Sequence, residues 1–382
     1  MDLTNADIAA LTDLRHALHR QPELSGEEHQ TAHRIAADLA ALAPDGILTG
    51  LGGHGVAACF DGAADGPTIL FRCELDALPI VETGTPPHRS KVAGKGHLCG
   101  HDGHMSILVG LARLLARHRP RHGRVVLLFQ PAEETGAGAA AVLADPKFGS
   151  VLPDFAFSLH NRPGLPTGRV ALVSGPVNCA SRGLRATFTG KSAHASEPEN
   201  GTSPMAALCR VMPALMALGH GAPHDPDFSL VTVTHARMGE PAFGIAPGDA
   251  TLMATLRTLT DDGMDRLCSR AHALLDDAAR DHGLSVSRAY HDVFHQCDND
   301  PEATRILARA LDRLGLPHDS TGLPMRASED FGLFGTHAHA AMLFLGAGTD
   351  HPALHNPDYD FPDELIAPGI RIFWQVTRDM LG

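Results

Sequence analysis

Short and almost uninterrupted apolar runs constrain the fold of this chain more than any other feature of its sequence. The segments between them carry helical patterns. The runs lie at 55–60, 68–73, 124–130 and 154–160. Strands that are apolar throughout are buried on both faces, as in parallel sheets covered by helices. This part is therefore predicted to be an α/β layer with a mixed, mostly parallel sheet. Two helices are expected before it, at 6–19 and 26–42, with Ser25 as the cap of the second.

A second texture begins near residue 180, where the strands become amphipathic. Helical patterns at 203–219 and 261–282 separate these strands, in the order strand, helix, two strands, helix, strand. That order is typical of a small α+β sandwich. We therefore predict a catalytic domain in two parts, 1–179 and 293–382, with an inserted α+β domain at 180–292.

Charge and hydropathy exclude several classes of partner. The formal net charge is −13, from 31 Lys and Arg against 44 Asp and Glu, which argues against a nucleic-acid partner. No apolar run reaches the roughly 18 residues of a membrane span, and the N-terminus lacks the basic region of a signal peptide. The seven cysteines form no CxxC pair. These observations predict a cytoplasmic protein without a membrane partner.

The segment 97–104, which reads HLCGHDGH, is the densest cluster of chemically active side chains, in a chain that contains 25 histidines. Cys99 and His101 are two residues apart and flanked by glycine, so both can reach one metal ion. A metal-bound thiolate can also bridge two cations. Asp102 has a second interpretation, as a simple cap of the following helix.

An acidic pair, Glu133 and Glu134, directly follows the apolar run at 124–130 and Pro131. Catalytic groups in α/β sheets collect at the carboxyl ends of the strands. One glutamate of such a pair can bind a metal while the other acts as the base for a metal-bound water. A solvated acidic turn is the alternative interpretation.

Three further strand ends carry side chains of the same kind. His160 ends the run at 154–160, Asp76 follows the run at 68–73, and His355 lies in a loop after the apolar run at 340–346. Each position taken alone has an ordinary structural explanation. Together they predict a metal site at one edge of the sheet.

These blocks occur in an order that resembles the aminoacylase/carboxypeptidase-type dinuclear metallopeptidases. The resemblance is strongest to the amidohydrolase branch, with hippurate hydrolase, N-acyl-L-amino-acid amidohydrolases and indole-acetyl-amino-acid hydrolases. The blocks are FRCELDALPIVE, HLCGHDGH, QPAEE, NRPGLPTG after His160, GKSAHASEP, SEDFG and LHNPDYDF. The opening LRHALHRQPELSGEEHQTA extends the resemblance over nearly the whole chain.

The resemblance implies a site with two divalent metal ions, zinc or manganese, with cobalt or nickel also possible. Glu133 would be the general base, and Asp76 would orient a metal ligand. Cys99 would bridge the ions, and the remaining implied ligands are His101, Glu134, His160 and His355.

The inserted domain, by the same resemblance, would be a lid and a dimerisation surface. His194 would donate a hydrogen bond to the developing oxyanion, and Arg257 would bind a substrate carboxylate. Gly244 stands where the family commonly has a substrate-contacting Asn. Glu74 and Glu240 also depart from the family pattern, which has Asp and Gly at these positions.

The predicted function is therefore metal-dependent hydrolysis of the amide bond of an N-acyl amino acid or a similar small conjugate, by a homodimer. Three alternatives remain open: a dipeptidase or carboxypeptidase of the same family, a non-catalytic metal-bound homologue that binds a ligand, and a cysteine hydrolase that uses Cys99.

Overall fold

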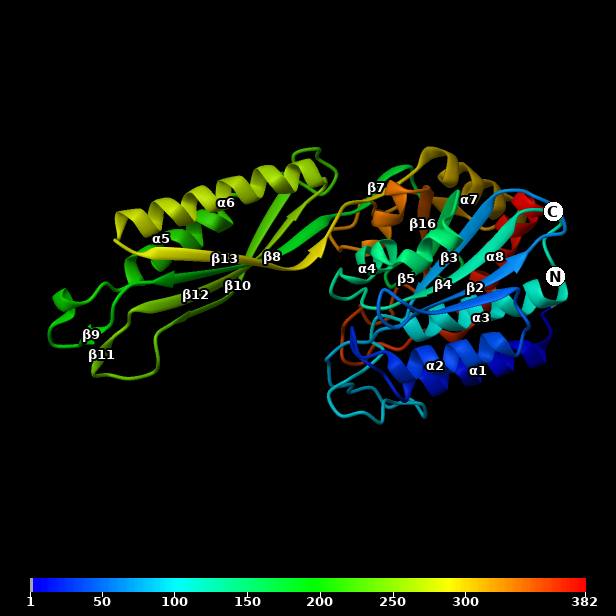
Figure 1. Cartoon of the computed structure of the whole chain (residues 1–382), viewed down its shortest axis with the longest axis horizontal. Coiled ribbons are helices and arrows are strands. Elements are labelled where there is room, and N and C mark those ends of the chain that lie inside the picture. The colour runs from blue at the N-terminus through cyan, green and yellow to red at the C-terminus, as the bar shows by residue number, and fades with distance from the viewer. Residues whose placement is uncertain (1–2) are drawn as a thin grey trace. The chain divides into compact units, whose positions relative to one another are not determined.

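The computed structural model describes residues 3–382, which form two compact units (Figure 1). The first unit contains the chain up to Val177 together with Asp298–Leu323 and Asp330–Gly382. The second contains Asn178–Cys297 and Pro324–Glu329. The predicted insertion at 180–292 lies within this second unit.

An eight-stranded sheet forms the centre of the first unit. In spatial order its strands are β1 (Gly46–Leu51), β2 (Gly55–Asp61), β4 (Arg124–Gln130), β3 (Thr68–Glu74), β5 (Phe155–Arg162), β16 (His339–Gly346), β6 (Val170–Ala171) and β15 (His318–Asp319). The four central strands, β4, β3, β5 and β16, are parallel to one another. β1 and β2 pair antiparallel with their neighbours, and β6 is antiparallel to β16 but parallel to β15. The carboxyl ends of the central strands therefore lie at one edge of the sheet.

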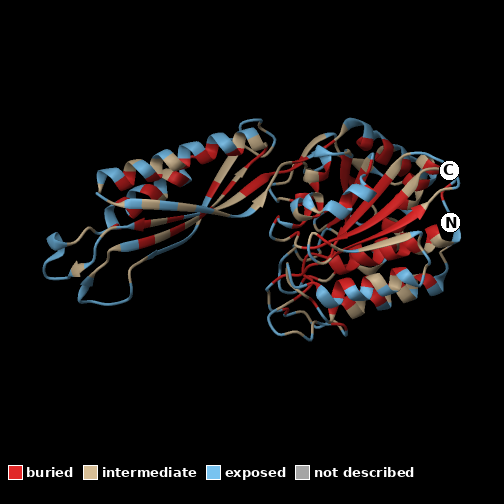
Figure 2. Ribbon diagram, in the orientation of Figure 1, coloured by how far each residue is buried: buried red, intermediate tan, exposed pale blue. Residues whose placement is uncertain are grey.

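Helices pack around this sheet, and its inner strands are buried almost throughout (Figure 2). They are α1 (Asn5–His19), α2 (His29–Ala40), α3 (His101–Arg117), α4 (Gly138–Ala144), α7 (Pro301–Leu314) and α8 (Ile366–Leu381), with 3₁₀ turns at Pro146–Val151, Asp330–Thr336 and Asp363–Leu365. α3 packs against α1, α8 and β3. Gly110 permits the close approach of α3 to α8, because a Cβ there would lie 2.2 Å from Ile370 Cδ1.

The second unit is an antiparallel four-stranded sheet with two helices. The strands lie in the order β10 (Ser229–Met238), β12 (Asp249–Thr258), β8 (Ala180–Thr189) and β13 (Ser285–Phe294). Exposed or half-buried residues alternate with buried ones along β12, because α5 (Met205–Met216) and α6 (Asp261–Asp281) pack against the sheet. The fold class predicted from the sequence, an α/β domain with an inserted α+β domain, is confirmed.

Short elements complete the second unit and the crossings between the units. β9 (Ala193–His194) pairs with β11 (Ile245–Ala246), and a 3₁₀ turn spans Pro198–Asn200. β7 (Gly175–Asn178) pairs with β14 (Cys297–Asn299) where the chain leaves the first unit and returns to it. Within residues 3–382, no helix combines the length and the apolar character that crossing a bilayer requires.

The predicted cap of α2 is wrong. The helix begins at His29, and the Ser25 hydroxyl donates to Asp76 instead of capping it. The Glu23 carboxylate accepts from the backbone N–H groups of Gln30 and Thr31 and takes over that function. A cap pattern in the sequence does not reveal that a distant carboxylate competes for the hydroxyl.

Candidate metal centre

The strand ends and the start of α3 bring a thiol and two imidazoles together. Cys99 and His101 come from the amino-terminal end of α3, and His160 comes from β5. All three side chains are buried, and their ligand atoms lie within 4.8 Å of one another. Cys99 Sγ is 3.5 Å from His160 Nε2. These are sulfur and nitrogen donors of the kind that bind zinc and similar divalent ions.

The acidic pair after β4 joins this group from the other side. Glu133 Oε2 and Glu134 Oε1 each lie 3.9 Å from His101 Nε2. His355 Nε2 is 3.4 Å from Glu134 Oε2, and Cys99, Glu134 and His355 form a second group whose ligand atoms lie within 4.8 Å. The two groups share Cys99. The structure therefore brings together all five residues that the sequence analysis suggested as metal ligands.

His355 reaches this position from a loop rather than from a strand. Its backbone has φ of +66°, a left-handed conformation that costs energy in a residue with a Cβ. Its backbone N–H donates to the Leu98 carbonyl at 2.8 Å, which ties the loop to the segment that carries Cys99. Its side chain is about half exposed. Such strain is often found at functional sites.

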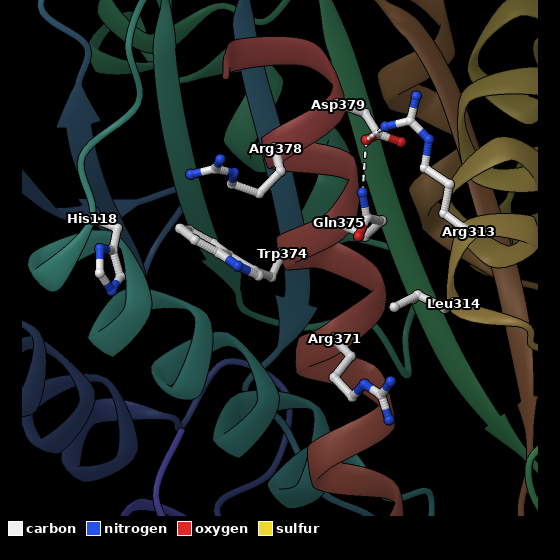
Figure 3. Close-up of a pocket in the computed structure, with 8 residues that line it drawn as sticks. All are labelled: His118, Arg313, Leu314, Arg371, Trp374, Gln375, Arg378 and Asp379. Atoms are coloured by element: carbon white, nitrogen blue, oxygen red, sulfur yellow. Dashed lines mark hydrogen bonds and ion pairs between the residues drawn. The ribbon is translucent and has the colours of Figure 1, made fainter. Parts of the chain in front are cut away.

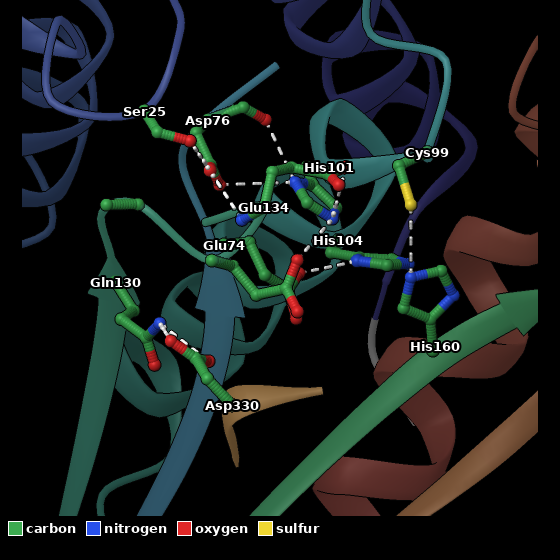
Figure 4. Close-up of polar contacts among 12 residues, drawn as sticks. Ser25, Glu74, Asp76, Cys99, His101, His104, Gln130, Glu134, His160 and Asp330 are labelled. Carbon is green, nitrogen blue, oxygen red and sulfur yellow. Dashed lines mark hydrogen bonds and ion pairs between the residues drawn. The ribbon is translucent and has the colours of Figure 1, made fainter. Parts of the chain in front are cut away.

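Asp76, just beyond β3, holds two members of the group in place (Figure 4). Its carboxylate accepts from Glu134 N at 2.9 Å and from the Ser25 hydroxyl at 2.7 Å. His101 Nδ1 donates to the Asp76 carbonyl at 2.9 Å, so Nε2 is the ring nitrogen that faces the other ligand atoms. Hydrogen bonds of this kind orient metal-binding histidines.

The site carries negative charge and buried atoms without partners. His101 Nε2 and Glu134 Oε1 are buried and have no hydrogen-bond partner within residues 3–382. Burial opposes protonation of His101, but Asp76, Glu74 and Glu134 outweigh it and raise its pKa to about 10. Burial, then Glu134 and Glu133, raise the pKa of the Cys99 thiol well above its usual range. A bound cation would satisfy these atoms and offset the charge, so the residues fit a metal centre.

A raised thiol pKa also bears on the cysteine hydrolase alternative. Nucleophilic cysteines have lowered pKa values, because the thiolate is the reactive form. Cys99 has the opposite environment, because burial and two nearby carboxylates raise the pKa of its thiol. The structure therefore favours Cys99 as a metal ligand over Cys99 as a nucleophile.

A second layer of buried polar residues supports the site, and the sequence analysis assigned it no role. His104 Nδ1 lies 2.6 Å from a Glu74 oxygen, and His104 Nε2 lies 2.6 Å from Asn161 Oδ1. Glu74 also forms an ion pair with Arg72. Burial opposes ionisation of Glu74, but Arg72 and His104 outweigh it and hold its pKa well below the usual range. Glu74, one of the departures from the family pattern, is thus part of a satisfied buried network.

The remaining predicted residues belong to the second unit. His194 lies on β9 and is exposed, with Nδ1 2.7 Å from the Ser196 hydroxyl. Gly244 is also exposed, and its carbonyl accepts a hydrogen bond from the backbone N–H of Ala195, the residue after His194, at 3.0 Å. Arg257 donates to the Ser328 hydroxyl at 2.9 Å. None of these residues belongs to the metal-ligand groups described above.

A separate pocket of about 610 Å³ lies between α7 and α8 (Figure 3). Trp374 and three arginines, Arg313, Arg371 and Arg378, are among its lining residues. Arg313 forms an ion pair with Asp379 across it. None of the residues that the sequence analysis selected lines this pocket.

A sequence profile decides the family. The profile of peptidase family M20/M25/M40 matches residues 70–379, which include every residue of the proposed metal centre. The chain belongs to this family. The family, and with it the prediction of a metal-dependent amidohydrolase, is confirmed.

Relatives in sequence and in structure align with this chain over nearly its whole length. N-acetyl-L-cysteine deacetylase of Bacillus subtilis (strain 168) is 30% identical over 376 residues, which span 97% of this chain and 88% of the relative. IAA-amino acid hydrolase ILR1-like 2 of Arabidopsis thaliana is 29% identical over 378 residues, 95% of this chain and 83% of the relative. The crystal structure of Bacillus subtilis YXEP, a dinuclear metal binding peptidase from the M20 family, has a TM-score of 0.83 at 26% identity and 99% coverage of both chains.

Proposed function

We propose that this protein hydrolyses the amide bond of a small N-acyl amino acid or similar conjugate. One observation carries the proposal: the Glu133 carboxylate lies 3.9 Å from His101 Nε2, beside the ligand groups that share Cys99. The names of the relatives, a deacetylase of N-acetyl-L-cysteine and a hydrolase of IAA-amino acids, support this substrate class.

Five residues would hold two divalent ions, with Cys99 as the shared ligand. Zinc or manganese is proposed, with cobalt or nickel as alternatives, since thiolate, imidazole and carboxylate donors suit several of these metals. When bound, the ions would supply positive charge that polarises the amide carbonyl and acidifies a water molecule. The other four ligands would be His101, Glu134, His160 and His355.

Glu133 would act as the general base. Its carboxylate accepts a proton from the attacking water and later delivers it to the nitrogen of the leaving amine. Asp76 would keep His101 and the Glu134 backbone in position through the hydrogen bonds that it makes to both. The two adjacent glutamates would therefore have different functions, Glu133 as the base and Glu134 as a metal ligand.

The second unit would recognise the substrate and act as a lid. His194 would donate to the oxyanion of the tetrahedral intermediate, and Arg257 would bind the substrate carboxylate. Gly244 offers no side chain at a position where the family commonly has Asn, so the amino-acid part of the substrate would be held differently here.

We also propose that the protein is a cytoplasmic homodimer that contacts the small substrate but neither nucleic acid nor membrane. All seven cysteines are free, which suits a reducing compartment. The dimer contact would use the second unit, where Met205 and Met216 on α5 are more than half exposed and β10 is an edge strand. Exposed apolar side chains on a helix beside an open sheet edge are typical of protein interfaces.

The test is a substrate panel with each metal supplied in turn. Chelated protein is reloaded with zinc, manganese, cobalt or nickel and incubated with N-acetyl, N-benzoyl and indole-acetyl amino acids, and the released amine is measured. We expect turnover of at least one N-acyl class and none after chelation. Dipeptides in the same panel test the dipeptidase alternative. Activity that survives metal removal, or inertness towards every substrate with every metal, would contradict the proposal.

A further inference from the structure

The segment 22–28, which reads PELSGEE, has no task in the chemistry above, although it lies against the catalytic elements. Leu24 forms a parallel bridge with Ala77, and Ala77 N donates to the Glu23 carbonyl at 2.8 Å. This pairing runs the segment alongside the end of β3. It places Ser25 at Asp76, to which its hydroxyl donates at 2.7 Å.

Glu28 extends from the same segment to the turn that carries the general base. Its side chain is fully buried, and Oε1 accepts from the backbone N–H of Ala132 at 2.7 Å. Glu28 Oε2 is buried and has no hydrogen-bond partner within the described part of the chain. A carboxyl group buried in this way is costly, and here it binds the backbone amide of Ala132.

The turn to which Glu28 is hydrogen-bonded, at Ala132, has a strained backbone. Ala132 has φ of +51°, the left-handed region that residues with a Cβ rarely adopt. Internal hydrogen bonds close the turn, from Gly136 N to the Glu133 carbonyl at 2.7 Å and from Gly138 N to the Ala132 carbonyl at 3.0 Å. Strained backbone persists only where its surroundings hold it.

Both backbone amides that flank Glu133 are therefore bound by buried carboxylates. Glu28 holds the amide of Ala132, and Asp76 holds the amide of Glu134 at 2.9 Å. Ser25 in turn supports Asp76. One short N-terminal segment thus reaches the residue before Glu133 directly and the residue after it through Asp76.

We propose that the segment 22–28 sets the direction of the Glu133 carboxylate, with Glu28 and Ser25 as positioning residues. The inference rests on the proposed function, in which Glu133 is the general base. Displacement of a catalytic group by about 1 Å can cost about 100-fold in rate. Loss of the Glu28 contact is therefore expected to act on kcat, because Glu28 belongs to none of the metal-ligand groups.

The test compares Glu28→Leu with two controls. Glu28→Gln keeps an oxygen that accepts from Ala132 N, and Glu27→Leu changes the exposed neighbour, whose ion pair with Lys95 lies at the surface. Each protein is measured for kcat and KM on an N-acyl amino acid, for metal content, and for amide hydrogen exchange in the peptide 131–138. Exchange is measured by mass spectrometry and needs no activity.

Glu28→Leu is expected to lower kcat about 10- to 100-fold, with KM and metal content close to wild type. Exchange in 131–138 should rise about three- to tenfold, in line with the loss of one buried hydrogen bond. Glu28→Gln should restore most of both properties, and Glu27→Leu should match wild type. If Glu28→Leu does not fold, Ser25→Ala is expected to show a smaller change in the same direction.

Unchanged exchange in 131–138 for both Glu28→Leu and Ser25→Ala would overturn the inference, and so would raised exchange with an unchanged kcat. Loss of metal together with activity would overturn it as well, because it would make Glu28 a support of the ligands. An inactive wild-type protein would instead contradict the proposed function, and the exchange data would still show whether Glu28 holds the turn.

Discussion

The two units hold their functional side chains in opposite ways. In the first unit the proposed base and most of the proposed ligands are buried, and charged partners surround them, as in the Asp76 and Glu74 networks. In the second unit His194 and Gly244 are exposed. His194 lies on the β9–β11 ribbon, which has only two residues in each strand, and Gly244 immediately precedes β11. The first unit thus holds its polar groups in fixed, buried positions, whereas the second unit presents its polar groups to solvent.

This difference matches the two tasks that we propose. A metal centre needs donors fixed in place before the cation binds, and buried hydrogen bonds supply that rigidity. A lid must meet a substrate that arrives from solvent, so its polar groups have to be accessible. Substitutions in the two units should therefore differ in which property they change.

The largest effect is expected at the base. Glu133→Gln keeps the size of the side chain but cannot accept the proton from water, so kcat should fall by about 10⁴-fold while metal content stays at the wild-type level. Glu134→Gln is the matched control and should lose metal as well as activity. Amine release and metal analysis on the same samples check both. Unchanged turnover in Glu133→Gln would remove this residue from the mechanism.

A substitution in the buried network of the first unit should lower the free energy of unfolding. His104→Ala leaves Glu74 with a buried carboxylate oxygen that has lost its partner at 2.6 Å. Breaking a buried charged contact costs about 3–5 kcal/mol, so the free energy of unfolding should fall by about that amount. Denaturant unfolding measures it. His291→Ala, at an exposed position of β13, should change the stability little, and equal losses in the two variants would refute the contrast between the units.

The opposite response is expected from the second unit, which we propose to be a lid. His194→Ala should lower kcat about 100-fold through loss of an oxyanion donor, with no measurable change in unfolding free energy because the side chain is exposed. Steady-state kinetics and denaturant unfolding of the same variant test this. A wild-type kcat would show that His194 takes no part in the reaction.

The smallest effect is a pH dependence of stability in the first unit. His19 Nδ1 lies 2.9 Å from Asp102 Oδ2. Burial opposes protonation of His19, but Asp102 and Glu82 outweigh it and raise its pKa to about 9. The stabilisation from charged His19 is therefore complete below pH 6.5 and is lost as the pH rises through about 9.

Denaturant unfolding of wild type and His19→Gln between pH 6 and pH 10 isolates this contribution. The difference between the two proteins should shrink as the pH rises. A difference that stays constant or grows with pH would contradict the assignment of a charged His19.

Much of the placement of the candidate metal ligands was predictable because it follows a local rule. Asp76 follows the apolar run of β3, and His160 lies near the carboxyl end of β5, so the strand direction places both at the same edge of a parallel sheet. The pair Glu133 and Glu134 follows β4 by the same rule. Helix and strand positions in both units also follow from apolar periodicity.

Contacts between distant segments were not predictable from such patterns. The pattern around Ser25 predicts a helix cap. Only the fold shows that Asp76, 51 residues further on, accepts a hydrogen bond from the Ser25 hydroxyl. Glu28 meets Ala132 across 104 residues, and nothing near Ala132 in the sequence indicates a positive φ. No pattern in the sequence gives His104 a role, and only the fold shows that its two ring nitrogens contact Glu74 and Asn161.

The most direct test of the metal centre is the number of divalent ions bound per chain. Inductively coupled plasma mass spectrometry on wild-type protein, loaded with zinc or manganese and then desalted, should find two ions per chain. Cys99→Ala should lose both the count of two and the activity, because Cys99 belongs to both ligand groups. A wild-type protein that holds no ion, or a Cys99→Ala variant that keeps two, would contradict a centre built around this cysteine.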